Sequence, residues 1–251
     1  MGKAINAGID MAMEPARYPL FIETLKGLVA DSTVPMARID DTVTRILRVK
    51  WAMGLRDPRR SQLADRKLHK SFGSVAHRKV ARQAVRESLV LLKNDHRTLP
   101  IPSHARHIHI AGHAGDDLGI QCGGWTVKWQ GQAGNVTPGG TTIRAAREQS
   151  VSSNTKVTFS ADDGNAAAGA DIAIVVVGEM PYAEGVGDRS DLSLAEADLA
   201  LIDTVAATGT PLVLVVISGR PLILGHTLEQ ASAVVAAKYD PLFPLGFGLT
   251  Y

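Results

Sequence analysis

The sequence predicts an α/β fold, a doubly wound and mostly parallel sheet sandwiched by helices, which follows a helical segment. From residue 107 onward, short β-branched runs alternate with amphipathic stretches, as in chains that build parallel sheets. Residues 172–177 are apolar throughout, which is typical of a strand covered on both faces. The 24 glycines suit the many tight loops of such a fold.

The order of these elements follows from their periodicity. Two helices with apolar stripes are expected over residues 141–149 and 195–207. Strands are expected over residues 107–111, 157–160, 172–177, 212–217 and 233–236.

The first third of the chain has a different pattern. We expect a short strand over residues 10–13 and helices over 19–30 and 39–54, with Gly54 as a C′ glycine. Ser74 is expected to cap a helix that continues to Asn94. The predicted divisions are residues 1–55, a linker over 56–75, and an α/β domain over 76–251.

Composition narrows the class of protein. With 45% hydrophobic residues, the 251-residue chain can bury a sizeable core, and its single cysteine, Cys122, excludes an internal disulfide. No run is long enough to span a membrane, and no apolar stretch of a signal peptide follows Met1. As it stands, the chain is therefore expected to be cytoplasmic.

The net charge of +2 conceals a basic block. Residues 38–106 hold 17 Lys and Arg against 6 Asp and Glu, whereas the remainder holds 10 against 19. The basic side chains are spread over amphipathic helices without interleaved aromatic residues. This pattern favours a basic helical face that packs on an acidic partner over a nucleic-acid-binding surface.

The loop after the apolar run concentrates chemistry. It carries Glu179, Tyr182, Glu184, Asp188 and Asp191. Such a loop is either a solvated acidic turn, or it carries side chains that bind a sugar and donate a proton to it. Glu179 and Glu184 are only five residues apart, so they are poorly placed to flank a sugar from opposite faces. We therefore expect one of them to act with a partner carboxylate elsewhere.

Trp125 and Trp129 lie in a loop flanked by glycines. Indole rings stack well on the C–H faces of sugars, although tryptophans commonly fill a core instead. The flanking glycines favour a displayed loop. The same residues also suit a non-catalytic carbohydrate-binding or scaffold module.

Two other patterns resemble a nucleotide site and a metal site, but each lacks part of the required spacing. The glycine-rich turn at residues 112–115 follows a strand but lacks the GxGxxG spacing of a nucleotide site. His104, His107 and His109 cluster without a third ligand at metal-binding spacing. No GxSxG motif occurs. We expect no metal and no cofactor.

Several segments together carry a resemblance to the C-terminal part of glycoside hydrolase family 3, the β-glucosidases and β-glucan exohydrolases. The helix IDDTVTRILRVKWAMGL resembles the one leaving the family's barrel, and HRKVARQAVRESLVLLKND resembles the opening of its second domain. The others are INAGIDMAMEP, QCGGWTVKWQG, VVVGEMPYAEGVGDRSDL, VVISGRPL and the terminal YDPLFPLGFGLTY.

The resemblance implies an (α/β)8 barrel followed by an α/β sandwich, with retaining hydrolysis of terminal β-D-glucosyl bonds. It implies that Glu184 is the general acid/base and that Trp125 stacks against the sugar. Glu179 and Tyr182 would support them in substrate binding. The substrate would be a β-linked glucoside or oligosaccharide, with neither nucleic acid nor membrane as a partner. Full-length relatives are often exported.

The chain departs from the family pattern in two places. Nearly all of the barrel, with its aspartate nucleophile, is missing, and no Ser-Asp-Trp segment occurs. The join near Ala237-Lys238 resembles an internal deletion. We therefore expect weak or no activity alone. We also expect the apolar side chains of the first 55 residues to be covered by self-association or by folding of these helices back onto the sheet; these side chains are Phe21, Leu25, Ile46 and Trp51. A complementary barrel domain is a further expected partner.

Overall fold

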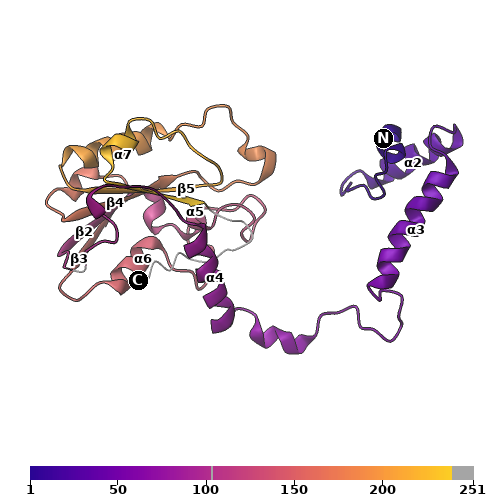
Figure 1. Cartoon of the computed structure of the whole chain (residues 1–251), viewed down its shortest axis with the longest axis horizontal. Coiled ribbons are helices and arrows are strands. Elements are labelled where there is room, and N and C mark those ends of the chain that lie inside the picture. The colour runs from indigo at the N-terminus through magenta and orange to yellow at the C-terminus, as the bar shows by residue number, and fades with distance from the viewer. Residues whose placement is uncertain (103, 239–251) are drawn as a thin grey trace. The chain divides into compact units, whose positions relative to one another are not determined.

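The computed structural model describes residues 1–102 and 104–238. The chain divides into two compact units, Met1–Lys70 and Ser71–Tyr251, and each is described by itself (Figure 1). The terminal YDPLFPLGFGLTY motif lies outside the described residues.

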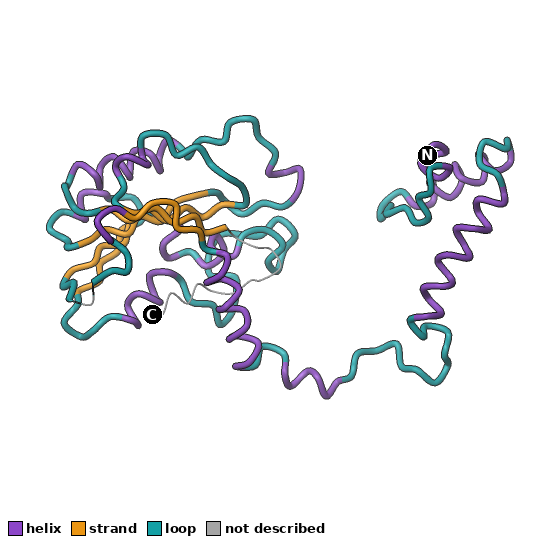
Figure 2. Tube along the Cα trace, in the orientation of Figure 1, coloured by secondary structure: helices purple, strands orange, loops and turns teal. Residues whose placement is uncertain are grey.

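The first unit is helical, as Figure 2 shows. Both predicted helices are present, and Gly54 follows the second with a φ of +71°, as a C′ glycine does. The helices are α1 (Gly2–Asn6), α2 (Tyr18–Ala30), α3 (Met36–Ala52) and the 3₁₀ helix η1 (Arg66–Ser71), whose last residue belongs to the second unit.

The predicted strand over residues 10–13 is wrong, because these residues have no regular secondary structure. A strand needs a neighbour to satisfy its backbone, and the regular elements described in this unit are all helical. Asp10 instead pairs with Arg38 of α3 at 2.7 Å, which fixes this segment through a side chain.

The second unit is built on a six-stranded sheet of order β1-β6-β5-β4-β2-β3. Of the six described strands, only β1 is antiparallel to its neighbour, so the predicted mostly parallel sheet is confirmed. The strands are β1 (Val90–Asn94), β2 (His107–Ala111), β3 (Lys156–Ser160), β4 (Ile172–Gly178), β5 (Leu212–Ser218) and β6 (Ala233–Lys238).

Strand β1 lies where the sequence predicts the end of a helix, and that prediction is wrong. Helix α4 (Val75–Ser88) begins as predicted, with the Ser74 side chain accepting from the His77 amide at 3.3 Å. It ends at Ser88, and Val90 and Leu91 pair with Ala236 and Val235 of β6 instead. Pairing with a strand 139 to 146 residues away in sequence overrides the local helical period.

Helices cover both faces of the sheet, with α7 (Glu196–Ala207) on one side and α6 (Ile143–Ser150) on the other (Figure 1). The remaining short helices are η2 (Asp95–Arg97), η3 (His113–Asp116), α5 (Leu118–Cys122), η4 (Gly164–Ala167), η5 (Glu184–Gly187) and α8 (Thr227–Gln230).

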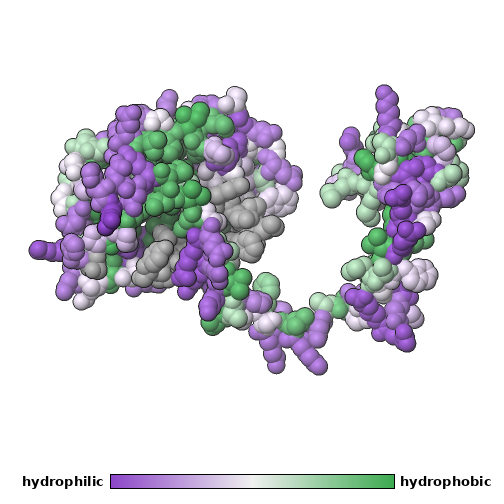
Figure 3. All heavy atoms as spheres, in the orientation of Figure 1, coloured by the Kyte–Doolittle hydropathy of each residue, from purple (hydrophilic) through white to green (hydrophobic). Residues whose placement is uncertain are grey.

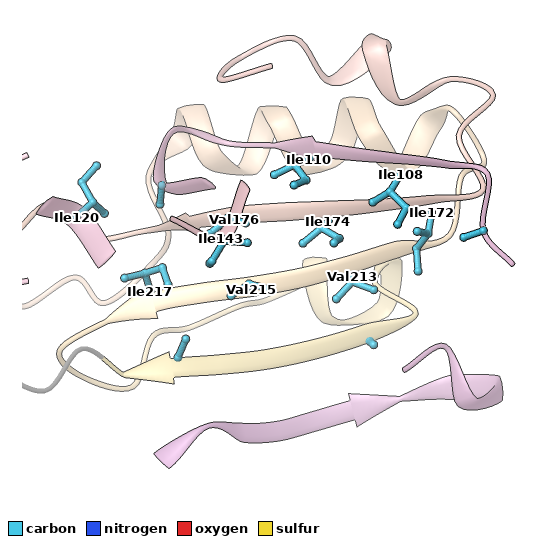
Figure 4. Packing of buried hydrophobic residues seen from close by; sticks show 14 residues of the cluster. Ile108, Ile110, Ile120, Ile143, Ile172, Ile174, Val176, Val213, Val215 and Ile217 are labelled. Atoms are coloured by element: carbon cyan, nitrogen blue, oxygen red, sulfur yellow. The ribbon is translucent and has the colours of Figure 1, made fainter. Parts of the chain in front are cut away.

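Strand β4 contributes to two cores, which explains its apolar sequence. Because successive strand residues face opposite sides, Ile174 and Val176 join the cluster that contains Ile143 of α6 (Figure 4). Val175 and Val177 join the cluster that contains Ile202 of α7.

The order of the parallel strands brings several loops to one edge of the sheet. After β2 the chain moves outward to β3 and then returns to β4 on the other side of β2. Ligands of such sheets bind outside the carboxyl ends of the strands at this reversal. The residues that follow β2, β4 and β5 therefore lie where the fold favours a binding site. Of the described helices, none has both the length and the apolar character to cross a membrane.

The surface of each unit mixes polar and apolar side chains (Figure 3). In the first unit the predicted contact residue Trp51 is 63% exposed, and Val49 and Met53 beside it are also exposed. Self-association or a complementary domain that covers these side chains stays a prediction. Sedimentation of the purified chain over a range of concentrations measures it, and a monomer at every concentration would contradict self-association.

Candidate functional site

Two loops meet at the carboxyl edge of the sheet. We call residues 121–131 the tryptophan loop and residues 179–191 the acid loop. The Ala183 amide donates to Gln130 Oε1 at 2.9 Å. Gly124 lies so close to the Tyr182 carbonyl that a Cβ atom there would overlap its oxygen. Although they are more than 40 residues apart in sequence, the loops are thus docked on each other.

Glu184 stands at the exposed point of the acid loop. It opens η5 and has a φ of +52°, in the left-handed region that non-glycine residues rarely adopt. Among the described residues, no hydrogen bond or ion pair engages its carboxylate, and the residue is exposed. A left-handed glutamate persists only where its surroundings hold it, and such strain is common at functional sites.

The tryptophan loop displays its two rings, as its glycines predicted. Trp125 and Trp129 are 50% and 56% exposed, with ring centroids 6.2 Å apart and planes tilted by 52°. The Trp125 amide donates to the Trp129 carbonyl at 2.8 Å, which closes the loop. Trp125 and Val127 also have φ values of +61° and +60°, so both docked loops contain left-handed residues.

Glu179 has a quite different environment from Glu184. It follows β4 directly and is 8% exposed. Its Oε2 accepts from the Tyr182 hydroxyl at 3.0 Å and the Gly219 amide at 3.3 Å. Its Oε1 lies 3.3 Å from Arg220 Nε and 3.4 Å from Arg189 Nη2. The carboxylate is therefore buried and surrounded by donors.

The two arginines were missed from the sequence. Arg220 follows β5, the neighbour of β4, in the segment Ser218-Gly219-Arg220. A cation directly after a predicted strand was a local signal, but its pairing with Glu179 follows from the adjacency of β4 and β5 in the sheet.

The remaining acids of the loop make local turns. Asp191 Oδ1 accepts from the Ser193 amide at 2.9 Å, and this bond lowers the pKa of Asp191. The Asp188 amide donates to the Gly185 carbonyl at 3.1 Å, which closes η5.

The histidine cluster joins two strands. His109 is fully buried on β2, where it lies 2.9 Å from Thr158 Oγ1 and 3.0 Å from Ser160 Oγ on β3. Burial lowers the pKa of His109 and favours the neutral ring. His107 also contacts Thr158, at 2.9 Å, whereas His104 is exposed. In the part of the chain that the structure describes, no group of three metal-ligating side chains is present.

The turn at Gly112 is explained by packing. Gly112 has a φ of +101°, and a Cβ atom there would overlap the carbonyl oxygen of Val176 on β4. The glycine therefore permits β2 and β4 to approach each other, which accounts for it without a bound phosphate.

His113 ties this turn to the other side of the sheet. Its Nδ1 lies 3.2 Å from Oδ1 of Asp198, a nearly buried residue of α7. The bond to Asp198 raises the pKa of His113, helped by the Asp117 charge and a bond to the Gly178 backbone. The imidazolium thus links three elements, including the residue that precedes Glu179.

This link predicts a pH dependence of stability. Because the folded pKa of His113 is raised, its contribution is fully present below the unfolded pKa of about 6.5 and is lost as pH rises through the folded value. We expect His113→Gln to reduce the decline in urea-unfolding free energy between about pH 5.5 and 8.5. His226→Gln is the control, since the His226–Asp203 pair is exposed. Equal declines in the wild type and His113→Gln would contradict the prediction.

Comparison with known proteins identifies the family. The model of the glycosyl hydrolase family 3 C-terminal domain matches residues 89–251. A lysosomal beta glucosidase of Dictyostelium discoideum is 32% identical over 95% of this chain. A periplasmic beta-glucosidase of Salmonella typhimurium is 30% identical over 92%. The chain spans about a third of the length of these relatives, 31% and 34%.

Solved structures agree with this assignment. The exo-1,3/1,4-beta-glucanase of a Pseudoalteromonas species aligns with a TM-score of 0.85 at 36% identity, covering 99% of this chain and 31% of that one. The beta-glucosidase of Listeria innocua aligns with a TM-score of 0.77 at 26% identity, covering 98% and 33%. The sheet with its carboxyl-edge loops is therefore a known architecture, and the chain belongs to glycosyl hydrolase family 3, of which it contains the C-terminal domain.

Proposed function

We propose that this chain supplies the general acid/base of a β-glucosidase-type hydrolysis of terminal β-D-glucosyl bonds, and that Glu184 is that group. The observation that carries the proposal is the geometry of Glu184. It is an exposed carboxylate in a left-handed conformation, on a loop docked against the loop that displays two tryptophans. The family assignment supports the reaction class.

The proposed reaction retains configuration and has two steps. In the first, Glu184 donates its proton to the glycosidic oxygen as the bond to the sugar breaks, and a carboxylate outside this chain bonds to the anomeric carbon. In the second, the Glu184 carboxylate takes a proton from water, whose oxygen attacks the same carbon and releases the nucleophile. Glu184 regains its proton, and one bond is hydrolysed.

The proposed substrate is a β-linked glucoside. The Listeria innocua beta-glucosidase was solved with glucose, and a variant of it was solved with laminaribiose. Another relative, 26% identical, is a beta-xylosidase of Formosa agariphila. The relatives thus include enzymes named for glucosides and for xylosides, so the test uses substrates of both kinds.

The test combines this chain with the barrel portion of a relative. Aryl β-glucoside, β-xyloside and N-acetyl-β-glucosaminide are offered to the chain, to the barrel and to the mixture. We expect weak or no hydrolysis by either part, and β-glucoside hydrolysis by the mixture. A mixture that forms a complex but leaves the β-glucoside intact would count against the proposal.

A non-catalytic carbohydrate-binding role is the second candidate, favoured by the two half-exposed indoles. We expect laminaribiose to change the tryptophan fluorescence of the chain alone. Trp125→Ala should weaken the apparent affinity by roughly 3- to 10-fold, the loss typical of one stacking contact. Trp51→Ala is the control, because that ring is also exposed but lies in the first unit. Binding without turnover in the reconstituted mixture would favour this role over catalysis.

A further inference from the structure

We propose that Arg220 is a positioning residue that holds the acid loop in the conformation in which Glu184 is presented. The inference deepens the proposed function, and it rests on that function for its meaning in catalysis. The geometry of the loop stands by itself.

Arg220 reaches the acid loop at three separate points. Its Nε lies 3.3 Å from Glu179 Oε1 and donates to the Tyr182 hydroxyl at 2.6 Å. Its guanidinium carbon stands 4.4 Å from the centroid of the Tyr182 ring. Its Nη2 donates to the Gly187 carbonyl. One side chain from the end of β5 thus fastens the start, middle and end of the segment 179–187.

Glu184 lies between two of these fastened points. Gly187 packs so closely on the Tyr182 ring that a Cβ atom there would overlap it, so residues 182–187 form a closed turn. On its other side the turn is held by the Gln130 bond to the Ala183 amide. A non-glycine residue keeps a φ of +52° only when such contacts determine its conformation.

Glu179 holds Arg220 in place in this arrangement. Its buried carboxylate accepts two hydrogen bonds and forms ion pairs with Arg189 and Arg220, so it compensates the Arg220 charge and anchors the arginine rather than contacting a sugar. A planar guanidinium can meet a carboxylate, a hydroxyl, a carbonyl and an aromatic face together, which an ammonium cannot. The arrangement therefore requires arginine at residue 220.

The test measures backbone amide hydrogen exchange by NMR in the full chain. The Ala183 and Asp188 amides flank Glu184 and are hydrogen-bonded, so they report opening of the turn. We expect Arg220→Ala to speed exchange at both amides by about tenfold or more, because bonds to a charged group are lost. Added guanidinium ion should restore slow exchange by occupying the vacated position. Tyr182→Phe, which removes only a hydroxyl, gives a smaller change and remains usable if Arg220→Ala fails to fold.

The matched control is Arg144→Ala. Arg144 also stands over an aromatic ring, 5.0 Å from the Phe159 centroid, and pairs with Asp116 and Glu148. It should leave exchange at Ala183 and Asp188 unchanged. Unchanged exchange in both Arg220→Ala and Tyr182→Phe, or equal acceleration in Arg144→Ala, would overturn the inference. The measurement needs no turnover, so it is independent of whether Glu184 is the acid/base.

Discussion

Glu184→Gln is expected to lower the hydrolysis of unactivated aryl β-glucosides by about 10²- to 10⁴-fold in the mixture of this chain with a barrel domain, the usual worth of a general acid/base. The amide keeps the shape of the side chain but neither donates a proton to the leaving oxygen nor takes one from water. The size of the loss should depend on the leaving group. A phenolate that leaves without protonation needs no acid in the first step, so the glycosyl-enzyme should form and then accumulate, because the second step still lacks its base. Measuring burst and steady-state rates across a leaving-group series separates the two steps.

Two additions sharpen this prediction. Azide, an anion that attacks without giving up a proton, should release the accumulated glycosyl-enzyme as the β-glucosyl azide. Asp188→Asn is the matched control, because Asp188 is another exposed acid of the same loop. Turnover by Glu184→Gln that equals the wild type, or a loss equal to that of Asp188→Asn, would refute the role of Glu184.

The sheet was largely predictable because its signals are local. Residues 172–177 are apolar at every position, and the structure explains this by a core on each side of β4. Strand β1 was not predictable in the same way. Its residues continue the apolar spacing of α4, and what makes them a strand is the partner β6. That partner is far away in sequence, so no window around residue 90 contains the information.

The site was predictable in part. The composition of the acid loop left open a solvated turn or a reactive group, and it did not distinguish Glu179 from Glu184. Only the family resemblance favoured Glu184. In the structure the difference is physical, since Glu179 is enclosed by donors from β5 and its own loop whereas Glu184 is exposed. The contribution of Arg220 depends on the position of β5 beside β4. A local stretch of sequence carries no information on which strands are neighbours in the sheet.

Gly124→Ala is expected to separate the tryptophan loop from the acid loop. A methyl group at residue 124 would overlap the Tyr182 carbonyl oxygen, and backbone cannot move aside as a flexible side chain can. Overpacking of this kind typically costs about 1–3 kcal/mol of folding free energy. We expect a loss in that range in urea unfolding, together with faster exchange of the Ala183 amide, whose partner Gln130 belongs to the displaced loop.

The matched control for this substitution is Gly185→Ala, on the acid loop itself. A Cβ atom at residue 185 would meet only Asp188 Oδ2, at an ordinary 3.8 Å. It should change the unfolding free energy by no more than about 0.5 kcal/mol.

If docking of the two loops is what brings the indoles to the acid/base, Gly124→Ala also abolishes the laminaribiose response of the tryptophans and the turnover of the reconstituted mixture. If instead Gly124→Ala leaves the unfolding free energy, the Ala183 exchange and the fluorescence response as in the wild type, the two loops act independently. The exposed carboxylate and the displayed rings would then be two separate features rather than one site.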